Sequence, residues 1–326
     1  MPTCLMCGSR DSLVAGQISV DKINAAYSAS YSTIVNHLFP LDAKVMDLNI
    51  CDNCGLGWYS PLVAGDDRFY EDLQKVDWYY QDYKPEYDFA KIHVADGNSV
   101  LEVGCGKGAF PRFLQKPIYY RGLEFNKAAV EKARSSGWDV LTVPLHKEAT
   151  ERAGFYDVVC HFQVLEHVLE PLNFLNDCVK ALSPGGKLIV AVPSEDSFLS
   201  LVENGWLNMP PHHLTRWTDR ALKSALTAAG LRTKEIWHEP VASFHLDWYR
   251  HVMINAGLKR LVGSAVGLES DQLWSKVSRR LSNFTFIRDI LLRSGEKSFT
   301  FSGRGHTVCA VAIKPPLTEE VSKKVQ

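Results

Sequence analysis

The stretch SVLEVGCGKGA, residues 99–109, most constrains what this chain can fold into. Its apolar first half is short enough for one buried β-strand. Its glycines, Gly104, Gly106 and Gly108, allow the backbone to turn sharply and to lie close to a ligand. Pro111 follows at a position where a helix can begin, because the first turn does not need its backbone N–H. A strand, a glycine turn and a helix in this order are typical of nucleotide-binding proteins.

Two acidic residues accompany this turn. Glu102 precedes the first glycine by two residues, and Glu124 lies near the end of the next expected strand, residues 118–125. An acid at the end of that second strand can accept hydrogen bonds from ribose hydroxyls. The spacing G-x-G-x-G differs from the G-x-G-x-x-G of dinucleotide-binding enzymes, which disfavours an NAD-dependent dehydrogenase.

Apolar runs and helical patterns alternate farther along the chain, which predicts an α/β fold with a parallel, doubly wound sheet. Ligands of such sheets bind beyond the carboxyl ends of the strands, where Glu102, Glu124, Gln163 and Pro193 fall. Ser183–Gly186 is expected to form a turn before the fifth strand. Besides residues 100–103 and 118–125, strands are expected at residues 138–143, 155–163, 187–192, 231–238 and 305–314, and helices at residues 126–136, 146–154, 168–182 and 219–229.

Two C-x-x-C-G motifs pair Cys4 with Cys7 and Cys51 with Cys54. Four thiolates complete a tetrahedral Zn²⁺ site without an open position, so we expect a structural zinc ribbon over residues 1–60. The alternative, two redox pairs, is disfavoured because this segment lacks the βαβ pattern of thioredoxin-like proteins. Between the motifs we expect an added hairpin or helix over residues 21–49.

Composition excludes some classes of partner. The 326 residues carry a net charge of −1, which is poor support for binding to nucleic acid or to an anionic membrane. No apolar run approaches the ~20 residues of a membrane span, and the first ten residues lack the layout of a signal peptide. The remaining cysteines are scattered, which favours a reducing compartment. We therefore expect a soluble, cytoplasmic protein, and the oligomeric state stays open.

Two further segments flank the expected sheet. Residues 61–97 are dense in aromatic and acidic side chains, which predicts amphipathic helices that pack the ribbon onto the core; alternatively, one or two of the tyrosines cover a cofactor or substrate. Residues 240–303 form a basic helical insertion that we interpret as a lid, and contact with a phosphate is the alternative. Helices are expected there at residues 244–256, 272–281 and 286–292, and a charged tail at residues 317–326.

The glycine turn, the segments FYDVV, LEHV and LSPGGKLIVAVP, and the later PPHHLTRWT resemble class I S-adenosylmethionine (SAM)-dependent methyltransferases. The branch that they resemble includes ubiquinone-type O-methyltransferases and enzymes that modify sugars or polysaccharides, and several of its members carry an N-terminal four-cysteine ribbon. The resemblance covers residues 4–233 and 305–314. It implies a Rossmann-like sheet of seven strands whose last strand is an antiparallel edge, with the SAM-binding core at residues 98–239 and 304–316.

The resemblance also implies roles at the strand ends. Glu102 and the glycine loop should hold the methionine end of SAM, Glu124 the ribose hydroxyls, and Gln163 with Val164 the region of the sulfonium. The adenine contact stays open because residues 141–146 lack the acid that many relatives have there. The expected SAM-binding set is Glu102, Gly104, Cys105, Gly106, Gly108, Glu124, Phe125, Gln163 and Val164.

Methyl transfer mainly requires alignment of donor and acceptor, and a hydroxyl acceptor benefits from a general base. Candidate bases follow the fourth strand, as Glu166 and His167, and the fifth, as His212 and His213. Histidine titrates near neutrality, so we expect His212 or His213 to be the base and the other to anchor the loop. For Glu166 and His167 the alternative is helix capping and packing. His161 is expected to be a hydrogen-bonded core residue.

The sequence thus predicts a SAM-dependent methyltransferase that acts on a small hydroxylated acceptor, such as a nucleotide- or lipid-linked sugar bearing phosphate, with O-transfer favoured. One rival is an RNA methyltransferase that grips RNA with its ribbon; residues 1–60 carry only three Lys or Arg against five Asp, which disfavours it. The other rival is a non-catalytic SAM-binding scaffold in a biosynthetic complex.

Overall fold

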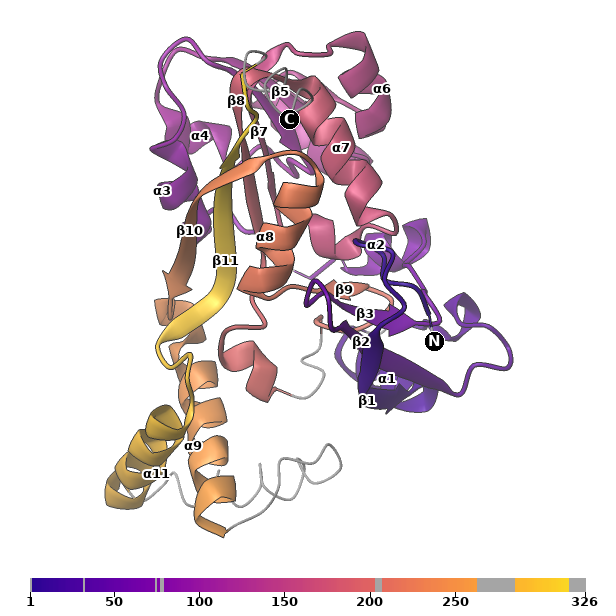
Figure 1. Cartoon of the computed structure of the whole chain (residues 1–326), viewed down its shortest axis with the longest axis vertical. Helices are drawn as coiled ribbons and strands as arrows, with labels where there is room; N and C mark the ends of the chain where they lie inside the picture. Colours follow the sequence, from indigo (N-terminus) through magenta and orange to yellow (C-terminus); the bar gives the residue numbers. More distant parts are fainter. Residues whose placement is uncertain are drawn as a thin grey trace, which may run out of the picture.

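The computed structural model describes residues 2–31, 33–73, 75–76, 79–202, 207–262 and 285–316. In this part of the chain a seven-stranded sheet has the order β10-β11-β8-β7-β4-β5-β6, and a four-stranded sheet has the order β1-β2-β3-β9. The smaller sheet lies beside one end of the larger one (Figure 1). Among the described helices none has the length and apolar character needed to cross a membrane.

The larger sheet confirms the predicted doubly wound α/β fold. Its parallel strands are β4 (Ser99–Val103), β5 (Tyr119–Leu123), β6 (Val140–Leu141), β7 (Tyr156–Phe162) and β8 (Leu182–Pro193). β11 (Arg304–Ile313) is antiparallel to both β8 and β10 (Arg232–Pro240). The expected antiparallel strand is therefore present, but its expected place at the edge is wrong. β11 lies between β8 and β10 and pairs with both, and β10 forms the edge of the sheet instead.

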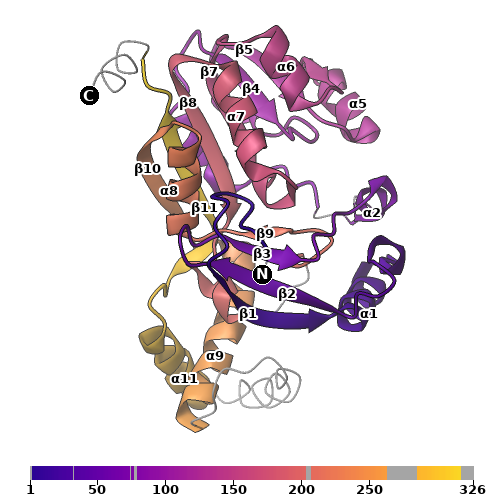
Figure 2. The ribbon, with the colours of Figure 1, turned by 45° about the vertical axis from the view of Figure 1, so that its right-hand side comes forward.

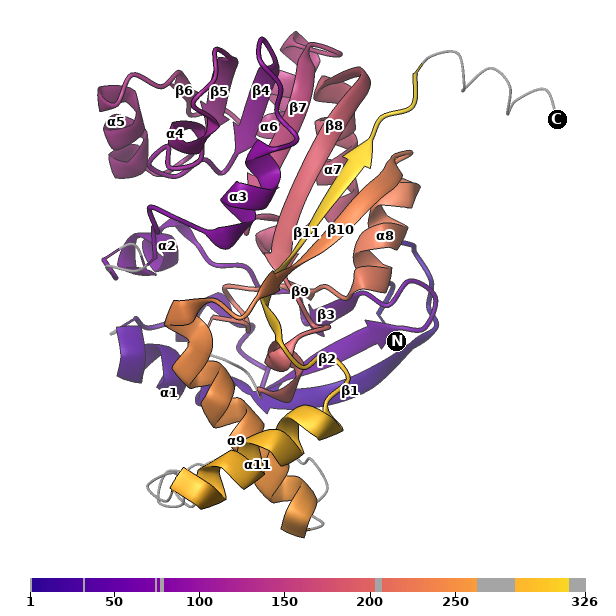
Figure 3. The ribbon, with the colours of Figure 1, turned by 90° about the vertical axis from the view of Figure 1, so that its left-hand side faces the viewer.

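Helices cover both faces of this sheet (Figure 3). One face packs against α6 (Leu145–Glu151), α7 (Pro171–Ala181) and α8 (Asp219–Ala228), and the other against α3 (Pro85–Lys91), α4 (Pro111–Leu114) and α5 (Lys127–Ser135). Asn126 and Thr218 cap α5 and α8, because each side chain accepts a hydrogen bond from a backbone N–H of the first turn. The continuous apolar runs of the strands follow from this burial on both sides.

Two strands, β6 and β8, differ most from their predicted bounds. β6 spans two residues rather than residues 138–143. β8 begins at Leu182, before the expected turn at Ser183–Gly186, because that stretch bulges out inside the strand: the register passes from Tyr156↔Leu182 directly to Val158↔Lys187. His161 is fully buried as predicted, but neither of its ring nitrogens has a hydrogen-bond partner among the described residues.

The N-terminal part builds the smaller sheet (Figure 2). It contains β1 (Ser12–Ser19), α1 (Val20–Tyr31), η1 (Asn36–Leu38), β2 (Val45–Cys51), β3 (Gly57–Ser60) and α2 (Asp67–Leu73). Between the two cysteine motifs the chain thus forms β1, α1, η1 and β2, and β1 pairs with β2. The fourth strand, β9 (Thr215–Arg216), comes from far along the chain and pairs with β3. The smaller sheet is therefore completed by residues that lie between β8 and α8.

Beyond β10, a pair of helices projects past the end of the large sheet (Figure 3). After η4 (Ser243–His245), α9 (Leu246–Val262) crosses α11 (Thr285–Ser298), and η3 (Phe198–Leu201) packs against α9. Gly257 and Gly295 permit this crossing, since a Cβ on either would lie 2.0 Å from a carbonyl oxygen of the other helix. The helix expected at residues 272–281 and the tail expected at residues 317–326 lie outside the described residues.

Candidate functional site

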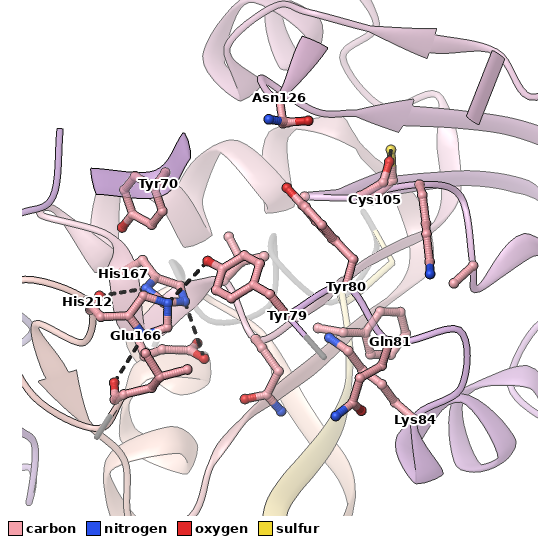
Figure 4. Close-up of a pocket in the computed structure, with 18 of the residues that line it drawn as sticks. Tyr70, Tyr79, Tyr80, Gln81, Lys84, Cys105, Asn126, Glu166, His167 and His212 are labelled. Atoms are coloured by element: carbon pink, nitrogen blue, oxygen red, sulfur yellow. Dashed lines mark hydrogen bonds and ion pairs between the residues drawn. The ribbon is translucent and has the colours of Figure 1, made fainter. Parts of the chain in front are cut away.

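A pocket of about 1640 Å³ opens beyond the carboxyl ends of β4, β5 and β7. Two of its sides contain most of the residues singled out in the sequence. We call Glu102, the loop 104–107 and residues 124–128 the donor wall, and Glu166, His167, His212 and His213 the histidine wall. In Figure 4, Tyr79 and Tyr80 lie between the two walls.

Backbone groups build much of the donor wall. The amide of Gly106 donates a hydrogen bond of 2.9 Å to Glu124 Oε2, while Glu124 Oε1 accepts from the amides of Phe125 and Asn126 at 2.9 and 2.8 Å. An ionised carboxylate offers about four acceptor positions. Three are used here, which leaves capacity for a hydroxyl that enters the pocket.

Glu102 lies at the bottom of the same wall. It is 2% exposed and accepts a hydrogen bond of 2.6 Å from the Tyr120 hydroxyl. Burial raises the pKa of Glu102 to about 8, since a carboxylate loses its hydration there. A cation that binds beside it would therefore draw it toward the ionised form.

Close contacts fix the shape of the glycine loop. Gly104 has a φ of +71°, and a Cβ there would lie 2.6 Å from Val164 Cγ2. A Cβ on Gly106 would lie 3.0 Å from the ring of Tyr80, which covers the loop. Gly108 instead faces Trp138 and is not among the residues that line the pocket.

Gln163 has an unusual backbone conformation at the tip of β7. Its φ of +60° is rare for a residue with a side chain, and such conformations concentrate at functional sites. The side chain donates to Glu86 Oε1 at 3.2 Å and to Thr307 Oγ1 at 3.3 Å. It thereby connects the donor wall to residues that no sequence motif indicated. Phe125, also predicted to bind the cofactor, lines the pocket with its side chain 66% exposed.

The histidine wall joins two loops. η2 (Leu165–His167) carries Glu166 and His167 directly after β7. In the loop before β9, the amides of His212 and His213 both donate to the carbonyl of Met209, each at 3.1 Å. This tight bend places two consecutive side chains on the same side, with their rings stacked at 4.6 Å between centroids.

The Nδ1 atom of each histidine in this wall contacts an oxygen that has no proton to give. His167 Nδ1 lies 2.6 Å from the carbonyl oxygen of His212, His212 Nδ1 lies 3.0 Å from that of Leu207, and His213 Nδ1 lies 3.0 Å from Asn208 Oδ1. The Nδ1 atoms must therefore be the donors, and each Nε2 keeps a lone pair. That of His212 accepts from the Tyr79 hydroxyl at 3.2 Å.

Glu166 is fully buried, and neither of its carboxyl oxygens has a hydrogen-bond partner among the described residues. Its Oε1 lies 3.8 Å from Nε2 of both His167 and His213. Burial raises the pKa of Glu166 to about 8 and lowers that of His167 to about 4. Burial also lowers the pKa values of His212 and His213. The wall therefore favours neutral side chains near pH 7.

The N-terminal part holds the histidine loop in place. The Tyr27 hydroxyl donates to Met209 O at 3.1 Å, the Gly65 amide to Pro211 O at 3.0 Å, and the Tyr59 amide to Leu214 O at 3.1 Å. On the side of the large sheet, the carbonyl of Glu166 accepts a hydrogen bond of 2.8 Å from the Leu214 amide. The histidine loop is thus fixed by the N-terminal part on one side and by Glu166 on the other. No sequence pattern indicated these contacts.

A third side of the pocket was missed by sequence reasoning. It brings together Glu86 of α3, Glu239 of β10, His245 of η4 and His306 of β11. Burial raises the pKa of Glu239 to about 7, and its Oε1 has no hydrogen-bond partner among the described residues. These residues come from four separate elements, so no local pattern marks them. Lys84, which also lines the pocket, forms no ion pair with any described residue.

The four N-terminal cysteines converge at a separate place. The Sγ atoms of Cys4 and Cys54 lie 3.5 Å apart, as do those of Cys7 and Cys51, and all four lie within 4.8 Å of one another. Tetrahedral zinc with bonds of about 2.3 Å separates its sulfurs by about 3.8 Å, so this arrangement fits such an ion. The Arg220 side chain of α8 donates to the carbonyls of Asp52 and Asn53, which ties the cluster to the core.

Comparison with known proteins adds to this geometry. Residues 78–236 match the family described as "Methyltransferase domain". Ubiquinone biosynthesis O-methyltransferase of Vibrio parahaemolyticus is 35% identical over 97 residues, which are 28% of this chain and 41% of that protein. The protein of the same name from Parvibaculum lavamentivorans is 29% identical over 159 residues, 42% of this chain and 59% of the relative.

The chain thus spans about half the length of the curated relatives it matches. Among solved structures, a SAM-dependent methyltransferase from Archaeoglobus fulgidus aligns with a TM-score of 0.46 and 15% identity, covering 70% of this chain and 94% of that one. Over residues 78–236, about half of its length, this chain is therefore similar in sequence to the methyltransferase-domain family.

Proposed function

We propose that this chain is a SAM-dependent methyltransferase that transfers a methyl group to a hydroxyl of a small acceptor. The observation that carries the proposal is the shared pocket: the glycine loop and the histidine wall face the same space of about 1640 Å³. A methyl donor on the one wall and an acceptor oxygen against the other would be aligned for in-line transfer. Such a pocket also suits a small molecule better than a polymer.

The donor wall supplies groups that fit SAM, which when bound presents an electrophilic methyl group on its sulfonium. The remaining acceptor capacity of Glu124 suits the ribose hydroxyls, and Glu102 suits the ammonium of the methionine moiety. Lys84, without an ion pair among the described residues, is a partner for the methionine carboxylate. Tyr80 covers the loop and excludes water.

The histidine wall is the place where the acceptor hydroxyl would lose its proton. Nε2 of His167 and of His213 each have a lone pair that no described residue occupies, which favours His213 over His212 as the base. The third side of the pocket, with Glu86, Glu239 and His245, offers hydrogen bonds to further hydroxyls. This supports a sugar or a related polyhydroxylated metabolite, nucleotide- or lipid-linked, as the acceptor. The cysteine cluster would hold structural Zn²⁺.

The test incubates the full chain with methyl-labelled SAM and separate sets of nucleotide sugars, lipid-linked sugars, quinol precursors and RNA. Formation of S-adenosylhomocysteine and a labelled sugar is expected, with loss of both in Glu124→Ala. Labelled RNA, or donor binding without transfer to any acceptor, would contradict the proposal and favour an RNA methyltransferase or a scaffold, respectively. The matched control is Glu131→Ala, an exposed acid on α5.

A further inference from the structure

The histidine wall encloses a gap between potential ligand atoms. The imidazole nitrogens of His167, His212 and His213 that face one another lie within 4.8 Å. Glu166 Oε1 is 3.8 Å from two of them, too far for a hydrogen bond. The three histidines therefore form a cluster of possible ligand atoms, and Glu166 lies beside two of them without forming a hydrogen bond to either.

Glu166 provides an independent observation. It is 0% exposed, and both carboxyl oxygens have no hydrogen-bond partner among the described residues. A buried carboxyl group without a partner is unfavourable, because it has lost its water and gained nothing in return. A cation in the gap would supply the missing partner.

The outer hydrogen bonds of the histidines point the same way. Each Nδ1 is held by an oxygen of His212, Leu207 or Asn208, which fixes each ring and leaves the lone pair of each Nε2 for another partner. Metal-binding histidines show this arrangement almost without exception. A catalytic carboxylate–histidine pair requires instead that the carboxylate hold the histidine by hydrogen bond, and Glu166 holds none of them.

We propose that Glu166, His167, His212 and His213 bind a divalent transition-metal ion. Three imidazoles and one carboxylate suit Zn²⁺, Fe²⁺ or Co²⁺ rather than Mg²⁺ or Ca²⁺. All four residues line the pocket, so the ion keeps an open side, in contrast to the four-thiol cluster. The ion's catalytic role rests on the function proposed above: it would bind the acceptor oxygen and lower its pKa. The histidines would then be ligands instead of bases.

Tyr79 supplies a test of the ligand assignment. Its hydroxyl occupies the lone pair of His212 Nε2, at 3.2 Å, so it competes with the ion for that atom. The variant Tyr79→Phe removes the competitor but keeps the ring. It should bind the ion about threefold more tightly, the amount expected for one modest hydrogen bond. Weaker binding in this variant would overturn the assignment of His212.

The main experiment is a Co²⁺ titration of the full chain after treatment with a chelator. Co²⁺ bound by the thiol cluster gives a sulfur-to-cobalt charge-transfer band. Co²⁺ bound by the histidine wall gives visible absorption bands but no charge-transfer band from sulfur, so the two sites can be followed separately. The wild type should bind two equivalents. Glu166→Gln and His213→Ala should weaken the equivalent without the sulfur band by about tenfold or more. The matched control, His146→Ala at an exposed position of α6, should bind like the wild type.

Binding of S-adenosylhomocysteine and a cooperative thermal transition show that each variant is folded. A folded His213→Ala variant that binds both equivalents like the wild type would overturn the site, as would a wild type that binds only the sulfur-ligated ion. If the wild type binds the second Co²⁺ ion but transfers no methyl group to any acceptor, the proposed function is contradicted and the metal site is supported. If it transfers methyl groups without binding that ion, the metal site is contradicted and the proposed function is supported.

Discussion

The two walls of the pocket are built in opposite ways. The donor wall comes from two short stretches, residues 102–107 and 124–128. Backbone amides supply many of its contacts, all of them to Glu124. The histidine wall combines residues 166–167 with residues 212–213, and the N-terminal part holds it in place. In the function proposed above, donor binding would therefore depend on local structure, whereas acceptor chemistry would depend on how distant segments assemble. The four predictions below test this contrast.

The largest effect is expected for His213→Ala. Turnover should fall about 10³-fold, because the wall loses either its base or a metal ligand. The dissociation constant for S-adenosylhomocysteine should stay within about threefold, since His213 belongs to the opposite wall. Steady-state kinetics and calorimetry measure the two quantities. An equal loss of donor affinity would show that the walls are not separate.

Gly104→Ala is the reciprocal change. A side chain at a φ of +71° is strained, and its Cβ would lie 2.6 Å from Val164 Cγ2. Affinity for SAM should fall about 100-fold, or ~3 kcal/mol, measured by calorimetry. The control Gly137→Ala has the same strain, with a φ of +86°, but no atom within 4 Å of its Cβ. It should lower the melting temperature and leave affinity unchanged; a similar loss in both variants would contradict the prediction.

Cys51→Ser tests the long-range support of the histidine wall. Loss of one of the four thiols should release the proposed zinc ion and loosen β3, in which the Tyr59 amide holds the histidine loop. Turnover should fall about 30-fold, while donor affinity stays within about threefold. Elemental analysis and kinetics check this, with Cys178→Ala, a buried cysteine of α7, as the control. If zinc is lost and turnover is unchanged, the N-terminal part does not support the site.

The smallest effect concerns pH. In the free protein burial holds the pKa of Glu102 at about 8, so the group is protonated at pH 6 and binding beside an ammonium must release its proton. Affinity for SAM should therefore rise with pH, by about tenfold per unit at most, and level off above pH 8. Calorimetry in buffers of different ionisation enthalpy detects the released proton. The variant Glu102→Gln should bind with no such slope, and a flat wild-type profile would contradict the prediction.

The same contrast explains what the sequence alone could predict. The strand–turn–helix around residues 99–114, the alternation of strands and helices and the cysteine pairing are local patterns, so the α/β sheet and the approach of the four thiols followed from them. The position of β11 inside the sheet did not, because an apolar, alternating strand fits an edge and an interior position equally well until its neighbours are known.

The histidine wall was predicted residue by residue but not as a unit. Glu166, His167, His212 and His213 are all recognisable as candidates, yet their convergence depends on the bend at Met209 and on contacts from Tyr27 and Gly65. Tyr79 belongs to the aromatic segment 61–97, for which a tyrosine cover over the cofactor or substrate was one interpretation. Glu239 and His245 belong to no motif, and their signal is the burial of polar atoms, which only the folded chain reveals.

The strand β9 has a consequence for how such proteins can diversify. Because Thr215–Arg216 pairs with β3, a foreign N-terminal module fused to residues 61–316 would leave β9 without its partner strand and the histidine loop without its support. Module exchange would have to carry the segment 207–216 along with it. We expect chimaeras that take both the N-terminal module and the segment 207–216 from one parent protein to keep that parent's preference for a methyl acceptor. Chimaeras that take only one of the two should lose methyl transfer.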